Sequence, residues 1–173
     1  AISAVTQDAD RLTRLLIDAE MKRFAGVKTP VVFLQNVVTD LLLGLGMHDM
    51  LAVFARHVEK KYAAEAGFIT MNLPKLVDAL EQAGIANSIV CANVNKIGFR
   101  MCGGIDAYRE VIASGRCRPI AMSVLASGAI PPAEAIEWVC GLEGLQSIVF
   151  GASSKGNIQQ TKQLIEQHWG TEP

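Results

Sequence analysis

The chain has 173 residues, of which 50% are hydrophobic and 6% aromatic, and its formal net charge is −1. This length suits one domain with a substantial core, and we expect a single α/β domain over residues 1–173. The near-neutral charge and the lack of a basic block argue against a nucleic-acid partner. The apolar runs are short and interrupted, so we expect no membrane partner either.

The four cysteines show neither C-x-x-C spacing nor a nearby pair of histidines; they are Cys91, Cys102, Cys117 and Cys140. This spacing disfavours a metal site and a disulfide framework, so we expect reduced thiols in a cytoplasmic protein. No secretory signal is visible. The chain begins with Ala1 rather than Met, which suits a fragment or a processed product.

The first third of the chain predicts two helices around one strand. A first helix is expected from a Thr6 cap to about Gly26. Its predicted inner stripe consists of Leu12, Leu15, Leu16 and Ala19. The β-branched run at residues 31–34 predicts a buried strand. A loop through residues 40–46 and a helix over residues 49–66 follow.

Apolar runs and glycine-terminated helical patterns then alternate to the end of the chain. Strands are expected at residues 68–71, 88–92, 120–125 and 148–150. Helices are expected after a cap at Asn72, over residues 105–114, after Pro131, and over residues 158–167.

These patterns amount to about five βα units, which predict a parallel sheet built by right-handed crossovers. An open doubly wound sheet is one solution. We favour a (β/α)8 TIM-type barrel, because polar residues follow nearly every strand at the same end. Such a barrel typically needs about 250 residues, so we expect this chain to be its C-terminal part, with N-terminal βα units missing.

The turn after the last strand has the composition of a phosphate-binding site. Gly151 allows close approach of the backbone, Ser153 and Ser154 offer hydroxyls, and Lys155 supplies positive charge before a helix N-terminus. Ser127 and Gly128 follow the preceding strand, and barrel phosphate sites often combine the last two such loops. The alternative is an ordinary βα turn with Asn157 as the helix N-cap.

Other polar residues at the expected strand ends form a neutral, hydrogen-bonding rim, which suits a polyhydroxylated or phosphorylated ligand better than a metal cluster. These rim residues are Gln35, Asn36, Thr39, Thr70, Asn72, Asn93 and Asn95. Two residues are candidate catalytic groups. Lys96 is the candidate for a Schiff base, and Asp40 is a candidate general base at a strand end. Helix caps and turns are the structural alternative for all of them.

The last third of the chain resembles the closing part of an aldo/keto reductase barrel. The resemblance is carried by Arg118-Pro-Ile-Ala-Met-Ser-Val-Leu-Ala-Ser-Gly128, by the helical segment from Pro132 to Val139, and by Ser147-Ile-Val-Phe-Gly-Ala-Ser-Ser154. It implies that Gly151, Ser153, Ser154 and Lys155 contact the phosphate of a nicotinamide cofactor, so NADPH is a candidate ligand. Gln35 stands where this family has its catalytic histidine, and the family's tyrosine, aspartate and lysine lie on strands that this chain lacks.

The sequence leaves three functions open. The leading one is binding of a phosphorylated small molecule or nicotinamide cofactor at the C-terminal strand ends, with oxidoreductase character. The second is a lyase or isomerase of phosphosugars that uses Lys96. The third is a non-catalytic barrel fragment or scaffold, which needs a homo-oligomer or a missing N-terminal segment to cover its sheet edges.

Overall fold

The computed structural model describes residues 2–169, with side chains from Asp8 onward. Five parallel strands form one open sheet in the order β1-β2-β3-β4-β5. The elements in chain order are α1 (Ile2–Met21), η1 (Lys22–Phe24), β1 (Val31–Leu34), α2 (Asn36–Leu45), α3 (Asp49–Tyr62), β2 (Glu65–Thr70), α4 (Leu73–Gln82), β3 (Ile89–Asn93), α5 (Gly104–Ala113), β4 (Arg118–Met122), η2 (Ala126–Gly128), α6 (Pro132–Cys140), β5 (Ser147–Ile148) and α7 (Lys155–Trp169).

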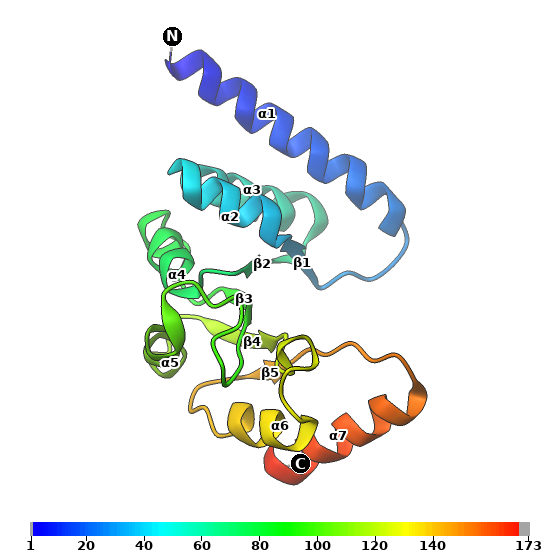
Figure 1. The fold of residues 1–173 in the computed structure, drawn as a ribbon. Coiled ribbons are helices and arrows are strands. Elements are labelled where there is room, and N and C mark those ends of the chain that lie inside the picture. The colour runs from blue at the N-terminus through cyan, green and yellow to red at the C-terminus, as the bar shows by residue number, and fades with distance from the viewer. Residues whose placement is uncertain (1, 170–173) are drawn as a thin grey trace.

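The strand order equals the chain order, so every crossover moves across the sheet in the same direction. Right-handed crossovers of this kind place their helices on one face of the sheet. Figure 1 shows the helices following one another in an arc around the strands, from α1 at one end to α6 and α7 at the other. The sheet has no reversal of strand order, which a doubly wound sheet contains.

The hydrophobic core lies between the sheet and this arc of helices. Its fully buried side chains include Phe68 and Val90 from the strands, and Leu51, Leu76 and Ile136 from the helices. Alternation along a strand turns every second residue toward the helices, which is why Phe68 and Thr70 are buried while Ile69 between them is half-buried. The predicted parallel sheet of βα units is therefore confirmed.

Two predictions about the first third of the chain are wrong. The first helix begins at Ile2, before Thr6, and its predicted inner stripe faces solvent: Leu12, Leu15 and Leu16 are 57%, 58% and 60% exposed. The helix packs instead through Ile17 and Met21. The loop expected at residues 40–46 is the second half of the helix α2, because the apolar run after β1 turns directly into helix.

Other local signals are confirmed. The strand β1 spans the predicted residues, and Asn72 caps α4 by accepting a hydrogen bond from the Lys75 amide at 3.3 Å. All four cysteines are free thiols.

Among the described residues, no helix combines the length and the apolar character that a membrane crossing requires.

Candidate functional site

The loops that follow β4 and β5 enclose a cavity of about 620 Å³ at the carboxyl end of the sheet. Its walls are residues 122–125 and 149–151, together with Ser127 and Gly128. This volume falls within the range of ~300–1,000 Å³ that is usual for small-molecule sites. Ligands of parallel α/β proteins bind at this end of the strands. Three predicted site residues, Ser127, Gly128 and Gly151, therefore come together around one space.

The backbone of the loop after β4 is unusual. Ser123, Ala126 and Ser127 have φ values of 55°, 48° and 59°, in the left-handed region that non-glycine residues rarely adopt. The turn at Ser123 ends β4 at Met122, three residues earlier than predicted. Each such residue costs about 1–2 kcal/mol, and concentrations of backbone strain of this kind are frequent at ligand sites.

The polar groups of this cavity are available to a ligand. Ser123 and Ser127 are exposed, and within residues 8–169 neither hydroxyl is bonded to another residue. The amides of Phe150 and Gly151 also lack an acceptor within the described part of the chain. The amide of Val149, by contrast, continues the sheet by donating to the Ala121 carbonyl at 2.8 Å. The cavity thus combines free neutral donors with an apolar wall.

The start of α7 differs from the predicted phosphate turn. Ser154, and not Asn157, caps the helix, since its Oγ accepts the Asn157 amide at 3.2 Å. The Ser153 Oγ accepts the Asn157 Nδ2 at 3.1 Å. Ser153, Ser154 and Lys155 are exposed and do not line the cavity. In Figure 1 the chain runs out to the side after β5 before α7 begins.

Lys96 lies in the loop between β3 and α5. Its Nζ donates to Glu134 Oε1 at 2.7 Å, and the two side chains are 45% and 47% exposed. A lysine that forms a Schiff base is usually activated by desolvation or by a neighbouring cation. Lys96 has an anion as its neighbour and remains in contact with water, so this environment does not favour the covalent role.

Asp40 lies in α2 and holds the turn after β2. Its Oδ1 accepts the Thr70 hydroxyl at 2.5 Å, and its Oδ2 accepts the Met71 amide at 3.0 Å. Tyr108 fastens the same turn from α5, because its hydroxyl donates to the Met71 carbonyl at 2.7 Å. These contacts give Asp40 a structural role, because it holds the turn after β2 in the absence of any substrate.

Two buried asparagines, Asn93 at the end of β3 and Asn95 just after it, shape the loop that follows. The Asn93 Nδ2 donates to the Arg100 carbonyl at 3.1 Å. The Asn95 side chain donates to the Phe99 carbonyl and accepts the Phe99 amide, at 2.9 and 2.7 Å. At these positions the structural alternative of caps and turns is the one that the geometry supports.

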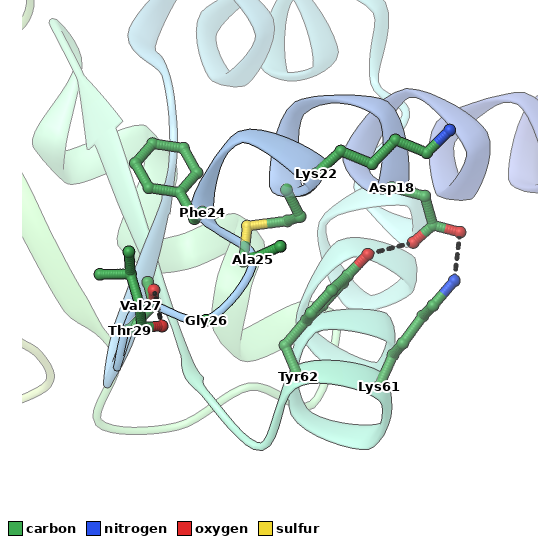
Figure 2. A pocket seen from close by; sticks show the side chains of 10 residues that line it. Asp18, Lys22, Phe24, Ala25, Gly26, Val27, Thr29, Lys61 and Tyr62 are labelled. Atoms are coloured by element: carbon green, nitrogen blue, oxygen red, sulfur yellow. Dashed lines mark hydrogen bonds and ion pairs between the residues drawn. The ribbon is translucent and has the colours of Figure 1, made fainter.

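A second cavity, of about 490 Å³, lies at the amino end of the sheet, where α1, η1 and α3 meet (Figure 2). Asp18 of α1 is its most connected residue. Lys61 and Tyr62 each donate to its carboxylate at 2.6 Å, and Nε2 of His57 lies 2.7 Å from Oδ1. These contacts fasten α1 to α3.

The charges of this cluster shift two pKa values. The hydrogen bond from Lys61, followed by those from Tyr62 and His57, holds the pKa of Asp18 well below its ordinary value. Burial, followed by the contact with Asp18, raises the pKa of Tyr62 to about 12. Asp18 is therefore ionised and Tyr62 neutral over the whole physiological range.

Sequence reasoning missed both the Asp18 cluster and six of the nine residues that line the cavity at the carboxyl end. His57 and Lys61 share one face of α3 by their spacing of four residues, which is a readable signal for a common acceptor, whereas Tyr62 is the last residue of the helix and gave no such signal. Ser123 gave no such signal, because its left-handed backbone is imposed by tertiary structure.

Comparison with known proteins identifies no relative. No family model matches the chain, and neither a curated protein nor a solved structure does. The resemblance to aldo/keto reductases therefore rests on the quoted residues alone.

Proposed function

We propose that the cavity between the β4 and β5 loops binds a small phosphorylated molecule. The observation that carries this proposal is the set of unpaired neutral donors around the cavity, namely the Ser123 and Ser127 hydroxyls and the Phe150 and Gly151 amides. Phosphate oxygens accept hydrogen bonds strongly, and backbone amides in tight turns are frequent phosphate ligands.

The rest of the ligand is expected to be partly apolar. Val124, Leu125 and Val149 line the same space and offer a surface for the flat face of a base or a nicotinamide ring. A nicotinamide cofactor has such a face, whereas a sugar phosphate would bind mainly through the polar donors of the cavity. If the bound ligand is NADPH, an oxidoreductase role follows; if it is a sugar phosphate, that role does not follow.

The sheet itself is proposed to be part of a barrel-type wall. Its strands are wound in one direction with helices outside, which is the winding of (β/α) barrels. The eight-unit TIM barrel stays a prediction, since the five strands of residues 2–169 form an open sheet.

Titration calorimetry with inorganic phosphate, NADPH and a panel of sugar phosphates tests the binding proposal. We expect at least one of them to bind at or below millimolar concentration. Gly151→Val should weaken this binding at least ~10-fold, because a Cβ at Gly151 meets nothing within 4 Å in the protein and points into free space at the cavity wall.

Ala152→Val is the matched control. Ala152 is exposed, lies one residue further on and does not line the cavity, so its affinity should equal that of the wild type. If no member of the panel binds at millimolar concentration, or if both variants bind like the wild type, the proposal is wrong.

The phosphosugar lyase prediction has a separate test. Borohydride reduction with candidate carbonyl substrates labels a lysine that forms a Schiff base. Label on the wild type that is lost in Lys96→Ala would support it. The ion pair between Lys96 and Glu134 leads us to expect no label.

A further inference from the structure

The face of the sheet that points away from the helices is largely apolar and partly exposed to solvent: Phe33 is 38% exposed, while Cys91 near its centre is buried. Alternation along the strands places on it the side chains of Phe33, Ile69, Ile89, Cys91, Ile120 and Met122. None of these residues belongs to the hydrophobic core between sheet and helices. All-parallel sheets are almost always covered on both faces, so this open face is an interaction surface.

The open face has a polar margin. Arg118 of β4 and Glu65 of β2 form an ion pair across β3 at the amino end of the sheet. Arg118 also donates to the Asn87 carbonyl at 2.9 Å. An apolar centre with a paired, neutral margin is the usual composition of a protein–protein interface.

The two ends of the fold each lack a neighbour in the described chain. β1 and β5 are the edges of the sheet, and their outer backbone groups are unpaired. In the helical layer α1 packs on α3, and α7 packs on α6. The side of α1 that points away from α3 carries the exposed residues Leu12, Leu15 and Leu16. In α7, Ile158 is exposed.

We infer that a second copy of this chain covers the open face. In a two-fold arrangement with the axis along the strands, β5 of each copy lies beside β1 of the other in parallel orientation. The same arrangement places α7 of each copy beside α1 of the other. This single two-fold rotation thus covers the apolar sheet faces, the sheet edges and the α1 leucine stripes of both copies. It agrees with the preference of oligomers for closed symmetry.

The interface area favours this occupant over a peptide. Five strands spaced by ~4.8 Å, with about four residues of ~3.3 Å each, present about 300 Å² of sheet. A stable interface buries about 800 Å² on each partner. The sheet face alone is too small, so the edges and the α1 stripe have to contribute, and a peptide seated on the face leaves those uncovered.

Sedimentation velocity over micromolar concentrations tests the inference. We expect a dimer for the wild type, and a dissociation constant at least ~100-fold higher for Ile120→Glu, because the new carboxylate lies in the apolar centre. Leu41→Glu is the control, since Leu41 lies on α2, is 58% exposed and stays outside the interface. A wild type that is monomeric at micromolar concentration overturns the inference.

Cross-linking tests the arrangement even if Ile120→Glu fails to fold. Leu15→Cys and Ile158→Cys chains, each in a Cys102→Ser background that removes the exposed native thiol, are mixed and treated with a bifunctional maleimide. Figure 1 places α1 and α7 at opposite ends of one chain, so a link between these positions joins two copies. We expect a cross-linked dimer in the mixture and none with either variant alone. No cross-link in the mixture contradicts the arrangement.

Discussion

The two cavities lie at opposite ends of the sheet and differ in how their polar groups are used. At the amino end the Asp18 carboxylate is bonded to three partners from α3. At the carboxyl end the Ser123 and Ser127 hydroxyls have no partner within residues 8–169, and the backbone that presents them is in the left-handed region. The first cavity closes a helix contact, and the second leaves donors available for a ligand.

The comparison teaches which polar clusters carry a functional hypothesis. A satisfied cluster such as Asp18, His57, Lys61 and Tyr62 stabilises the fold, and its removal should be felt in stability. An unsatisfied and strained loop lowers stability, and its removal should be felt in binding. The predictions below use this difference.

Asp18→Asn should produce the largest loss of stability. The substitution removes the negative charge beside Lys61 and replaces one of the two acceptor oxygens with an NH2 donor, which faces a donor of α3. We expect the free energy of unfolding to fall by about 2 kcal/mol, with no change in ligand affinity. Urea denaturation followed by circular dichroism measures the first quantity, and calorimetry the second.

Asp10→Asn is the matched control on the same helix. Among the side chains that the structure describes, Asp10 pairs with Arg14, one turn away, at 2.6 Å. Such an exposed pair within one helix contributes little to stability, so the loss should be much smaller than in Asp18→Asn. An equal loss in the two variants would contradict the role of Asp18 in fastening α1 to α3.

The pH dependence of stability should follow the same cluster. Because the pKa of Asp18 is lowered in the folded state, its contribution is present above the ordinary value of 3.8 and is lost as the pH falls below it. Because the pKa of Tyr62 is raised from 10.0 to about 12, its contribution is present below pH 10 and is lost as the pH rises between these values.

Thermal unfolding of the wild type and of Asp18→Asn between pH 2 and 11 measures this effect. The difference in stability between the two proteins should shrink below about pH 3.8, where Asp18 of the unfolded chain takes up a proton while Asp18 of the folded protein is still ionised. A difference that is constant with pH would show that the charge of Asp18 is not responsible.

Ser154→Ala should lower stability by about 1 kcal/mol, because it removes the side-chain cap of α7. Ligand affinity should be unchanged, since Ser154 does not line the cavity. Calorimetry with the tightest-binding ligand of the panel checks this. A large loss of affinity would instead favour the prediction that the phosphate sits at the start of α7.

Ser127→Gly should have the smallest effect on stability and the opposite sign. Glycine adopts the φ of 59° without strain, so we expect a gain of about 0.5 kcal/mol. Ligand affinity should fall several-fold with the lost hydroxyl. Denaturation and calorimetry on the same preparation separate the two, and a variant that loses stability would refute the claim of strain at this loop.

Local patterns predicted most elements of the fold. β1 was readable because a short β-branched run follows Thr29-Pro30, and the α4 cap because Asn72 precedes Pro74 in the first turn. α2 was missed because its apolar residues follow β1 without a loop signal and because Gly44 interrupts the pattern. Local propensity does not decide such a boundary.

Tertiary partners decided what the sequence left open. The most apolar stripe of α1 was predicted to face inward, yet α1 meets the rest of the chain through Ile17, Asp18 and Met21. Ser127, Gly128 and Gly151, which were predicted from composition as binding residues, line the cavity at the carboxyl end, and their role in binding stays a prediction. No local pattern encodes the left-handed turn at Ser123. The same holds for the role of Ser154 as the N-cap of α7.

Amide chemical shifts during a phosphate titration test the central claim most directly. We predict saturable shifts of the Ser127, Phe150 and Gly151 amides in ¹⁵N-labelled protein, with no change at Asp18 or Tyr62 at the other end of the sheet. Saturable shifts confined to the first turn of α7, or no shifts at millimolar phosphate, would contradict the account.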